Sequence, residues 1–194
     1  MPKRFDELQT PEELMQFMSA NLKYGFVNDD DKVFVTPDEL RQMEQHYKIR
    51  LGDDLIKNGY GLCWDQAELQ RLFFEKNNIP HECYFTANYN SQKRLGRTHT
   101  FLLYKDGDKT KWFEHAFGLQ RGIHEYDSKQ QALDEILCKL IQIAVKEGSE
   151  VARVEMFKYP KVTKSLTPSD FIMHCRSGER LPDVLKDNGG MMNN

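Results

Sequence analysis

The hydrophobic pattern changes its period after Pro80, and this change limits the folds that the chain can adopt. Between residues 63 and about 77, apolar side chains recur at helical spacing and form one wide arc, which predicts a mostly buried helix. The segments 83–89, 98–104 and 111–117 alternate instead, as the strands of an antiparallel meander do. A buried helix followed by a meander is typical of the α+β class rather than of alternating βαβ units.

Further helices are predicted on both sides of this core. Three helix starts share one capping device, with Thr at the N-cap, Pro at the first helical position and an acid at the third. These starts are Thr10-Pro11, Thr36-Pro37 and Thr167-Pro168. Another helix is predicted from Ser128 to about Gly148, and residues 151–157 are predicted to form an edge strand. Residues 48–62 show no regular period, which predicts irregular structure.

The length of 194 residues favours one domain with a substantial core. We therefore expect a single domain over 1–194, with its core at about 48–160. The N-terminal helices are expected within 10–47, and a polar tail covers about 178–194. Charged residues make up 29% and hydrophobic residues 39%, a balance that is ordinary for a soluble globular protein.

Charge and cysteine usage restrict the partners and the compartment. The net charge of −3 offers no basic surplus for nucleic acid, and no apolar run is long enough to cross a membrane. The N-terminus lacks the apolar segment of a signal peptide, which predicts a cytoplasmic protein with reduced thiols. The four cysteines are spaced irregularly and match no zinc pattern: Cys63, Cys83, Cys138 and Cys175.

Cys63 has the position of a nucleophile. Gly59 and Gly61 lead into it, and it opens the predicted buried helix. Free backbone N–H groups and the positive end of the helix dipole favour a thiolate there. The structural alternative is that Cys63 is a small buried hydrophobe, which is the commoner role of a cysteine at a helix start. The other three cysteines fall inside predicted strands or helices and are expected to belong to the core.

The predicted hairpin offers a base for this thiol. With Asp106-Gly107 as its two-residue turn, His99 lies directly opposite Glu114. Opposed side chains project from the same face, so Glu114 is placed to hold an imidazole nitrogen of His99. The neighbouring His115 points to the other face. A nucleophile, a base and a group that orients the base are what thiol catalysis needs.

The same strand face carries Phe101 and Leu103 beside His99, an apolar surface that we expect to receive the Cys63 helix. Such docking brings Cys63 to His99. The alternative for the histidine and acid is a structural cross-strand pair. A metal site from Cys63, His99 and the segment 81–83 has no standard zinc spacing, and we expect neither a metal nor a cofactor.

Three blocks, taken in order, resemble the transglutaminase-like superfamily of papain-like thiol enzymes. Gly61-Leu62-Cys63-Trp64-Asp65 resembles its nucleophile block, and Asn78-Ile79-Pro80 resembles the turn that follows. Residues 98–103 resemble the histidine strand, and 112–118 the block with an aromatic residue and then an acid. The resemblance covers about 59–127. The spacings of 36 and 15 residues between the three candidate residues suit a compact, bacterial-type member.

This resemblance implies a Cys63–His99–Glu114 triad on a helix packed against an antiparallel sheet. Cys63 would attack an amide or other acyl carbon, His99 would shuttle protons and Glu114 would orient His99. The backbone N–H of Trp64, or that of Cys63, would bind the oxyanion. The third residue is Glu, where the family most often has Asp, and its extra methylene changes its reach. No ligand set for calcium or for another cofactor carries over.

Three functions are consistent with these residues. The first is a thiol hydrolase or acyltransferase acting through an acyl-enzyme on a peptide, a protein or a small amide or acyl compound. The second is an inactive fold of the same type that serves as a binding module. The third is acyl transfer similar to that of arylamine N-acetyltransferases. The basic loop 92–97 either borders a cleft for acidic groups or is simply solvated.

Overall fold

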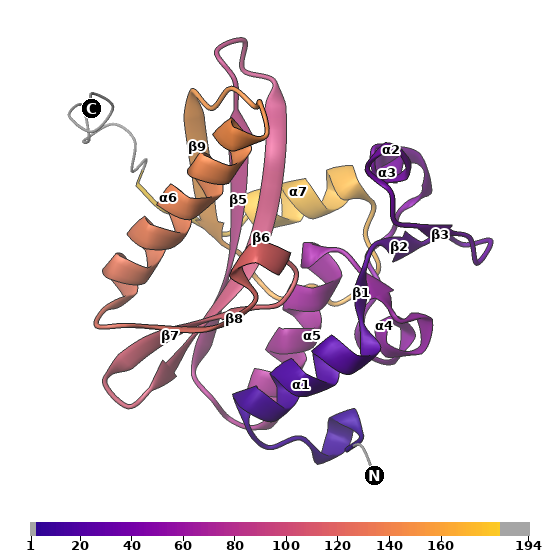
Figure 1. Ribbon diagram of the computed structural model, residues 1–194, viewed down its shortest axis with the longest axis vertical. Coiled ribbons are helices and arrows are strands. Elements are labelled where there is room, and N and C mark those ends of the chain that lie inside the picture. The colour runs from indigo at the N-terminus through magenta and orange to yellow at the C-terminus, as the bar shows by residue number, and fades with distance from the viewer. Residues whose placement is uncertain (1–2, 183–194) are drawn as a thin grey trace.

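The computed structural model describes residues 3–182 and has the predicted α+β class. Its centre is a six-stranded sheet with the strand order β10-β9-β5-β6-β7-β8, in which all neighbours are antiparallel. The strands are β5 (His81–Tyr89), β6 (Leu95–Asp106), β7 (Lys109–Glu114), β8 (Gly122–Tyr126), β9 (Arg153–Lys158) and β10 (Glu179–Arg180). Helices lie on both sides of this sheet (Figure 1).

One face of the sheet is covered by α5 (Cys63–Lys76) and α7 (Pro168–Arg176), and the other by α6 (Lys129–Lys146) (Figure 1). The fourteen residues of α5 form one helix, as the sequence predicts. Phe73 and Phe74 of this helix are fully buried. Ser128 is the N-cap of α6, and its side chain accepts the N–H of Gln131.

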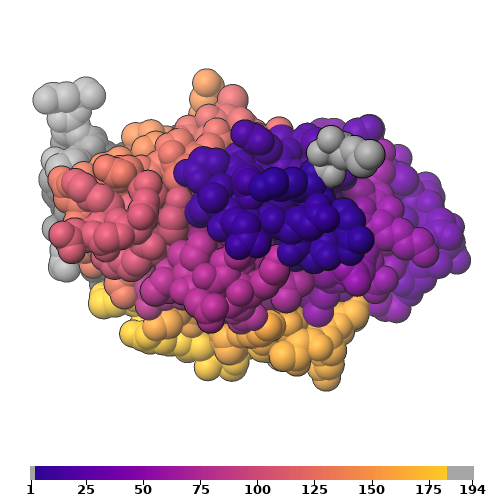
Figure 2. Space-filling view, turned by 90° about the horizontal axis from the view of Figure 1, so that it is seen from below, coloured from indigo at the N-terminus to yellow at the C-terminus, as the bar shows by residue number. Residues whose placement is uncertain are grey.

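The N-terminal third consists of short elements. They are η1 (Phe5–Glu7), α1 (Pro11–Asn21), β1 (Lys23–Tyr24), β2 (Phe26–Val27), β3 (Val33–Phe34), α2 (Pro37–Leu40), α3 (Met43–His46), α4 (Gly52–Asn58) and β4 (Tyr60–Gly61). Figure 2 shows the first of them, in indigo, lying against later segments of the chain in magenta and salmon. The parallel pairing of β1 with β4 ties this region to the turn before α5.

The predicted capping devices are present, but some element predictions are wrong. Thr10, Thr36 and Thr167 each accept the backbone N–H three residues later. The helix predicted from Thr36 is divided into α2 and α3, and the stretch 48–62 holds α4 and β4. These elements are too short to produce a period. The strand β8 and the 3-10 helix η2 (Gly118–Gln120) are also too short to show a period in the sequence, and neither was predicted.

The C-terminal part differs from the prediction at one strand. β9 is not an edge strand, because β10 pairs with it on the outer side. The predicted polar tail from 178 thus begins with β10, and its remainder from 183 lies outside the described residues. Within 3–182, no helix combines the length and apolarity that crossing a membrane requires.

The turn between β6 and β7 corrects the predicted hairpin. Asp106 pairs with Lys109, so the turn residues are Gly107 and Asp108 rather than Asp106 and Gly107. Gly107 has a φ of +58°, and a glycine at the first turn position is typical of a type II′ hairpin turn. Gly107 is therefore the first residue of the turn, whereas the prediction made it the second.

This correction shifts every cross-strand partner by two residues. The last backbone pair of the two strands is Leu102 with Phe113, and His99 and Glu114 lie beyond it. They are not directly opposite each other, so that part of the prediction is wrong. Since side chains alternate with a period of two, an even shift keeps each residue on its expected face.

The face that receives α5 also differs from the prediction. Phe101 and Leu103 pack under α6, in one of the two hydrophobic clusters. The cluster around α5 contains Phe85, Leu102 and Phe113, which point to the opposite side. The long amphipathic α6 follows β8 and covers the face that we had expected α5 to occupy. Local alternation shows that a strand has two apolar faces but does not show which helix covers each.

Candidate active site

Cys63 is the first residue of α5 and is almost buried, with 6% of its surface exposed. The turn before it is tightly packed. A Cβ on Gly61 would lie 2.7 Å from a methyl carbon of Leu55 and 3.2 Å from the Cβ of Asp65, so a larger residue there would require Leu55 to move. At the start of the helix, the N–H groups of Cys63 and Trp64 have no acceptor within the helix. The thiol thus lies beside free backbone donors.

His99 and Glu114 form a hydrogen-bonded pair. His99 Nε2 lies 2.8 Å from Glu114 Oε2, and only 2% of the Glu114 side chain is exposed. The other oxygen of Glu114, Oε1, accepts the backbone N–H of Phe117 at 2.8 Å. The ring of Phe117 lies 5.8 Å from the imidazole ring. Both carboxylate oxygens of Glu114 are therefore occupied, and the acid is held in one orientation.

The side chains of Cys63 and His99 lie close enough to each other to interact. Burial of His99 disfavours its charged form, but the carboxylate of Glu114 and the contact with Cys63 outweigh it and raise the pKa of His99 to about 10. The imidazole is consequently protonated at neutral pH. Since Glu114 takes Nε2, the nitrogen that remains for the thiol is Nδ1. The structure thus brings together the three side chains that the sequence singled out.

Asp65 anchors the turn that precedes Cys63. Its carboxylate accepts the backbone N–H of Leu62 at 2.7 Å and that of Arg50 at 2.6 Å. Burial raises the pKa of Asp65 to about 7, although these donors act in the opposite direction. Asp65 is not among the site residues that the sequence predicts. An acid at the third helical position is a capping signal, but it is hard to recognise after Leu62, which has no polar side chain.

A second hydrogen-bonded connection involves Gln66 and His115. Gln66 Nε2 lies 2.7 Å from the carbonyl oxygen of Gly61, and Gln66 Oε1 lies 2.6 Å from His115 Nδ1. His115 therefore contacts α5, and it is separate from the His99–Glu114 pair as its position in the strand predicted. Gln66 interrupts the apolar arc of α5, which was the only signal that the sequence offered for it.

Tyr24 lies beside the candidate residues from the N-terminal region. It pairs with Gly61 through the β1–β4 ladder. Although 43% of the residue is exposed, burial around its hydroxyl and then the nearby Cys63 raise its pKa above the usual range, while Arg97 acts in the opposite direction. Sequence reasoning missed Tyr24 because a two-residue strand has no detectable pattern.

The other cysteines and histidines are outside this site. Cys83 and Cys175 are buried as predicted, and burial raises the pKa of Cys83 to about 12. Cys138 is exposed on α6, so its expected place in the core is wrong: the helical arc at 138 faces solvent. Three histidines contact backbone carbonyl oxygens instead: His81, His124 and His174. Among residues 3–182, no group of three metal-ligating side chains is arranged to hold a metal ion.

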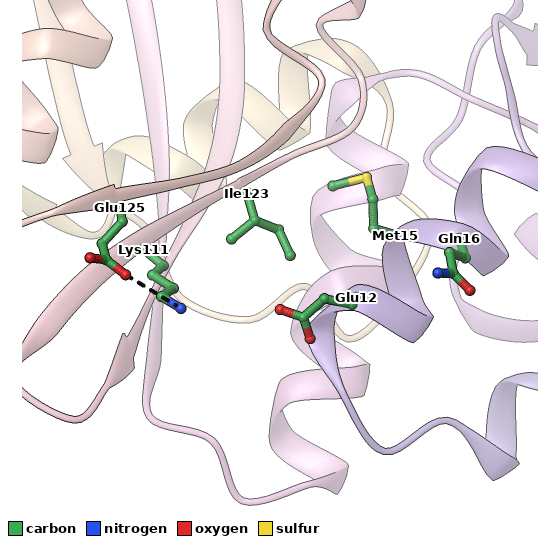
Figure 3. Close-up of a pocket in the computed structure, with 6 residues that line it drawn as sticks. All are labelled: Glu12, Met15, Gln16, Lys111, Ile123 and Glu125. Carbon is green, nitrogen blue, oxygen red and sulfur yellow. Dashed lines mark ion pairs between the residues drawn. The ribbon is translucent and has the colours of Figure 1, made fainter.

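Two surface cavities lie away from Cys63. One of about 410 Å³ separates α1 from β7 and β8 and is lined by Glu12, Met15, Gln16, Lys111, Ile123 and Glu125 (Figure 3). Lys111 forms a 3.6 Å ion pair with Glu125 across its rim. A second, of about 330 Å³, lies between η2 and α6 and includes Leu119 and Lys146. Neither cavity is lined by Cys63, His99 or Glu114.

Comparisons with known proteins complete this description. No protein-family model matches the chain, and no curated protein matches it. Among solved structures, it is similar to the crystal structure of an arylamine N-acetyltransferase from Bacillus cereus, described as having a unique Cys-His-Glu catalytic triad. The identity is 14% and the TM-score 0.33, over 56% of this chain and 42% of that one. The chain thus spans less than half the length of the enzyme that it matches.

Proposed function

We propose that the protein is a cysteine-dependent enzyme that transfers acyl groups through an acyl-enzyme, with Cys63 as the nucleophile. The observation that carries this proposal is the position of His99, whose imidazole is hydrogen-bonded to the carboxylate of Glu114 and lies beside the thiol of Cys63. A nucleophile, a base and a group that orients the base are the three parts of a catalytic triad.

The reaction begins with the Cys63 thiolate and the His99 imidazolium. The sulfur attacks the acyl carbon, a C–S bond forms, and the carbonyl electron pair moves onto the oxygen. The N–H groups of Cys63 and Trp64 stabilise this oxyanion. When the tetrahedral intermediate collapses, His99 gives its proton to the leaving amine or alcohol, and the bond to that group breaks. A thioester on Cys63 remains.

The second half of the reaction regenerates the thiolate. Water or an amine attacks the thioester, His99 accepts the proton of the attacking group, and the C–S bond breaks. Attack by water is hydrolysis, and attack by an amine is transfer. The substrate class is therefore an amide or ester of a peptide, a protein or a small molecule. Glu114 keeps the imidazole ring in one orientation through both half-reactions.

A second candidate is a binding module that keeps the fold without catalysis. The low exposure of Cys63 favours it, because only 6% of this residue is accessible and neither described cavity reaches it. The two candidates differ in one measurable property. In an enzyme, Cys63 reacts with an alkylating agent at mildly acidic pH, whereas in a binding module it reacts no faster than the exposed Cys138.

Selective alkylation tests the proposal. At about pH 6, iodoacetamide should label Cys63 at least about tenfold faster than the exposed Cys138, because only a thiolate reacts at an appreciable rate. Mass spectrometry of the digested protein gives both rates in the same sample. The variant His99→Ala should remove the difference. Slow and equal labelling of Cys63 and Cys138 in the unaltered protein would contradict the enzyme and favour the binding module.

A trapped acyl-enzyme separates hydrolysis from transfer. Mixing the protein with p-nitrophenyl acetate should give a burst of nitrophenolate and an intact mass that is larger by one acetyl group. Adding an amine acceptor then either accelerates the loss of that acetyl group, which indicates transfer, or leaves it unchanged, which indicates hydrolysis. The variant Cys63→Ser is the control that should show no burst.

A further inference from the structure

The side-chain amide of Gln66 joins two backbone segments that lie on either side of the candidate triad. Its Nε2 lies 2.7 Å from the carbonyl oxygen of Gly61, which closely precedes Cys63. Its Oε1 lies 2.6 Å from Nδ1 of His115, which directly follows Glu114. Gln66 itself is on the first turn of α5 and only 1% exposed. One amide thus spans from the nucleophile's turn to the end of the strand that carries the acid.

The hydrogen-bond partners define the direction of each bond. The carbonyl of Gly61 only accepts, so the NH₂ group of Gln66 must face it and Oε1 must face the histidine. Burial and then the positive charge of Arg121 lower the pKa of His115 to about 4, so its ring is neutral at physiological pH. A neutral ring that donates to Gln66 Oε1 carries its proton on Nδ1. The tautomer follows from the geometry.

This arrangement leaves a polar atom unpaired. His115 Nε2 is buried and has no hydrogen-bond partner within the part of the chain that the structure describes. A buried acceptor without a partner destabilises a fold, and an apolar side chain of similar size would avoid that cost. The hydrogen bond from His115 Nδ1 to Gln66 is therefore the reason for a histidine at this position.

We propose that Gln66 and His115 are positioning residues, which set the separation between Cys63 and Glu114 and thereby the contact of His99 with the thiol. This inference rests on the function proposed above for the same site. The backbone on both sides of His115 is held as well. Arg121 Nε–H donates to the carbonyl oxygen of His115 at 3.1 Å, and Phe117 N–H donates to Glu114. The neutral His115 keeps this link intact while the charged site beside it changes protonation.

The first test does not depend on activity. Long-range ¹⁵N NMR of the imidazole nitrogens at about pH 7 should find His115 in the Nδ1–H tautomer. The Nε2–H tautomer would remove the bond to Gln66 Oε1 and overturn the proposal. The protonated His99 provides an internal reference in the same spectrum.

The second test compares two variants of His115. His115→Asn keeps a donor near the position of Nδ1, and His115→Leu removes it. We expect His115→Leu to lower the rate of Cys63 alkylation at about pH 6 by about tenfold, because small displacements of reacting groups are costly, and His115→Asn to stay within about twofold. His124→Leu is the matched control, since the ring of His124 bonds to the backbone carbonyl of Gln120 and not to a residue of α5. Its rate should equal that of the unaltered protein.

The titration of His99 distinguishes positioning from a structural role. In His115→Leu the pKa of His99 should fall, because Glu114 moves, and in His115→Asn it should not. A purely structural role would lower the melting temperature of His115→Leu and leave the alkylation profile and the pKa of His99 unchanged, which would overturn the proposal. The double variant with Gln66→Leu should lose no more than His115→Leu alone, since both changes break one link.

The same measurements separate this proposal from the function on which it rests. If Cys63 of the unaltered protein is labelled no faster than Cys138, the proposed enzyme is refuted. The tautomer of His115 and the pKa of His99 in His115→Leu still decide whether the link exists and positions the pair. If Cys63 is selectively labelled and His115→Leu has no effect on either quantity, the enzyme stands and the positioning role fails.

Discussion

Two histidines near the start of α5 behave in opposite ways. His99 is paired with the carboxylate of Glu114, and its pKa is raised to about 10. His115 is paired with the amide of Gln66, and its pKa is lowered to about 4 by burial and by Arg121. Burial disfavours the charged form of both rings. The partner decides the outcome, because a carboxylate stabilises an imidazolium and an amide does not.

The largest expected effect comes from making the partner of His99 an amide as well. In Glu114→Gln, we expect the pKa of His99 to fall below neutral pH and the rate of Cys63 alkylation at about pH 6 to fall about a hundredfold. NMR titration and mass spectrometry measure the two quantities. The control is Glu82→Gln, which changes a carboxylate that bonds to surface lysines. A pKa of His99 that stays near 10 in Glu114→Gln would show that Glu114 is not its cause.

The dependence of stability on pH should have opposite signs for the two histidines. The pKa of His99 is raised in the folded state. Its contribution to the free energy of unfolding is therefore full below about pH 6.5 and is lost as the pH rises towards 10. The pKa of His115 is lowered in the folded state. Its contribution to the free energy of unfolding is therefore full above about pH 6.5 and is lost as the pH falls towards 4. Each pKa unit corresponds to about 1.4 kcal/mol, so His99 should have the larger effect.

Urea unfolding of His99→Gln and His115→Asn across this pH range measures both contributions. The difference in unfolding free energy between His99→Gln and the unaltered protein should shrink between pH 6.5 and 10, and that for His115→Asn between pH 6.5 and 4. If the two differences in unfolding free energy changed with pH in the same direction, the distinction between the two histidines would be wrong.

The reciprocal exchange gives His115 a carboxylate partner. In Gln66→Glu, we expect the pKa of His115 to rise, as an adjacent carboxylate favours the charged ring. The new oxygen also lies against the carbonyl of Gly61, which should destabilise the fold by about 1–3 kcal/mol. NMR titration measures the first effect and urea unfolding the second. An unchanged pKa of His115 would indicate that Gln66 does not face the ring.

The smallest effect should come from Glu114→Asp, which keeps the charge and shortens the side chain. Glu114 reaches His99 Nε2 and the N–H of Phe117 at 2.8 Å each, and a shorter acid cannot keep both bonds. We expect about a tenfold slower alkylation of Cys63 and a His99 that is still charged at neutral pH. A rate equal to that of the unaltered protein would show that the reach of Glu114 is not needed.

The candidate site was predictable where the signal is local. The glycine-led helix start identifies Cys63, and alternation along the strands separates His115 from His99 and Glu114. The hydrogen bond between His99 and Glu114 was expected from a directly opposed pair and is present through a different register. The bond forms despite the wrong register because the register differs by two residues, which leaves both side chains on the same face of the sheet, and because both side chains are long enough to meet.

Other parts of the site had no signal in the sequence. Gln66 was visible only as a polar residue in an apolar arc, and Tyr24 lies on a strand of two residues. The link from Gln66 to His115 joins residues that are 49 positions apart. Such contacts depend on how helices dock on a sheet, and no local period encodes that docking.

The amino-acid sequence by itself determined the α+β class, the capped helices, the start of α5 at Cys63 and the two faces of each strand, because hydrogen bonding and side-chain alternation act over a few residues. Only the tertiary structure decided which helix covers which face of the sheet and which group pairs with each of the two histidines. These depend on packing between distant segments, and the charge of His99 and of His115 follows from that packing rather than from the residue type.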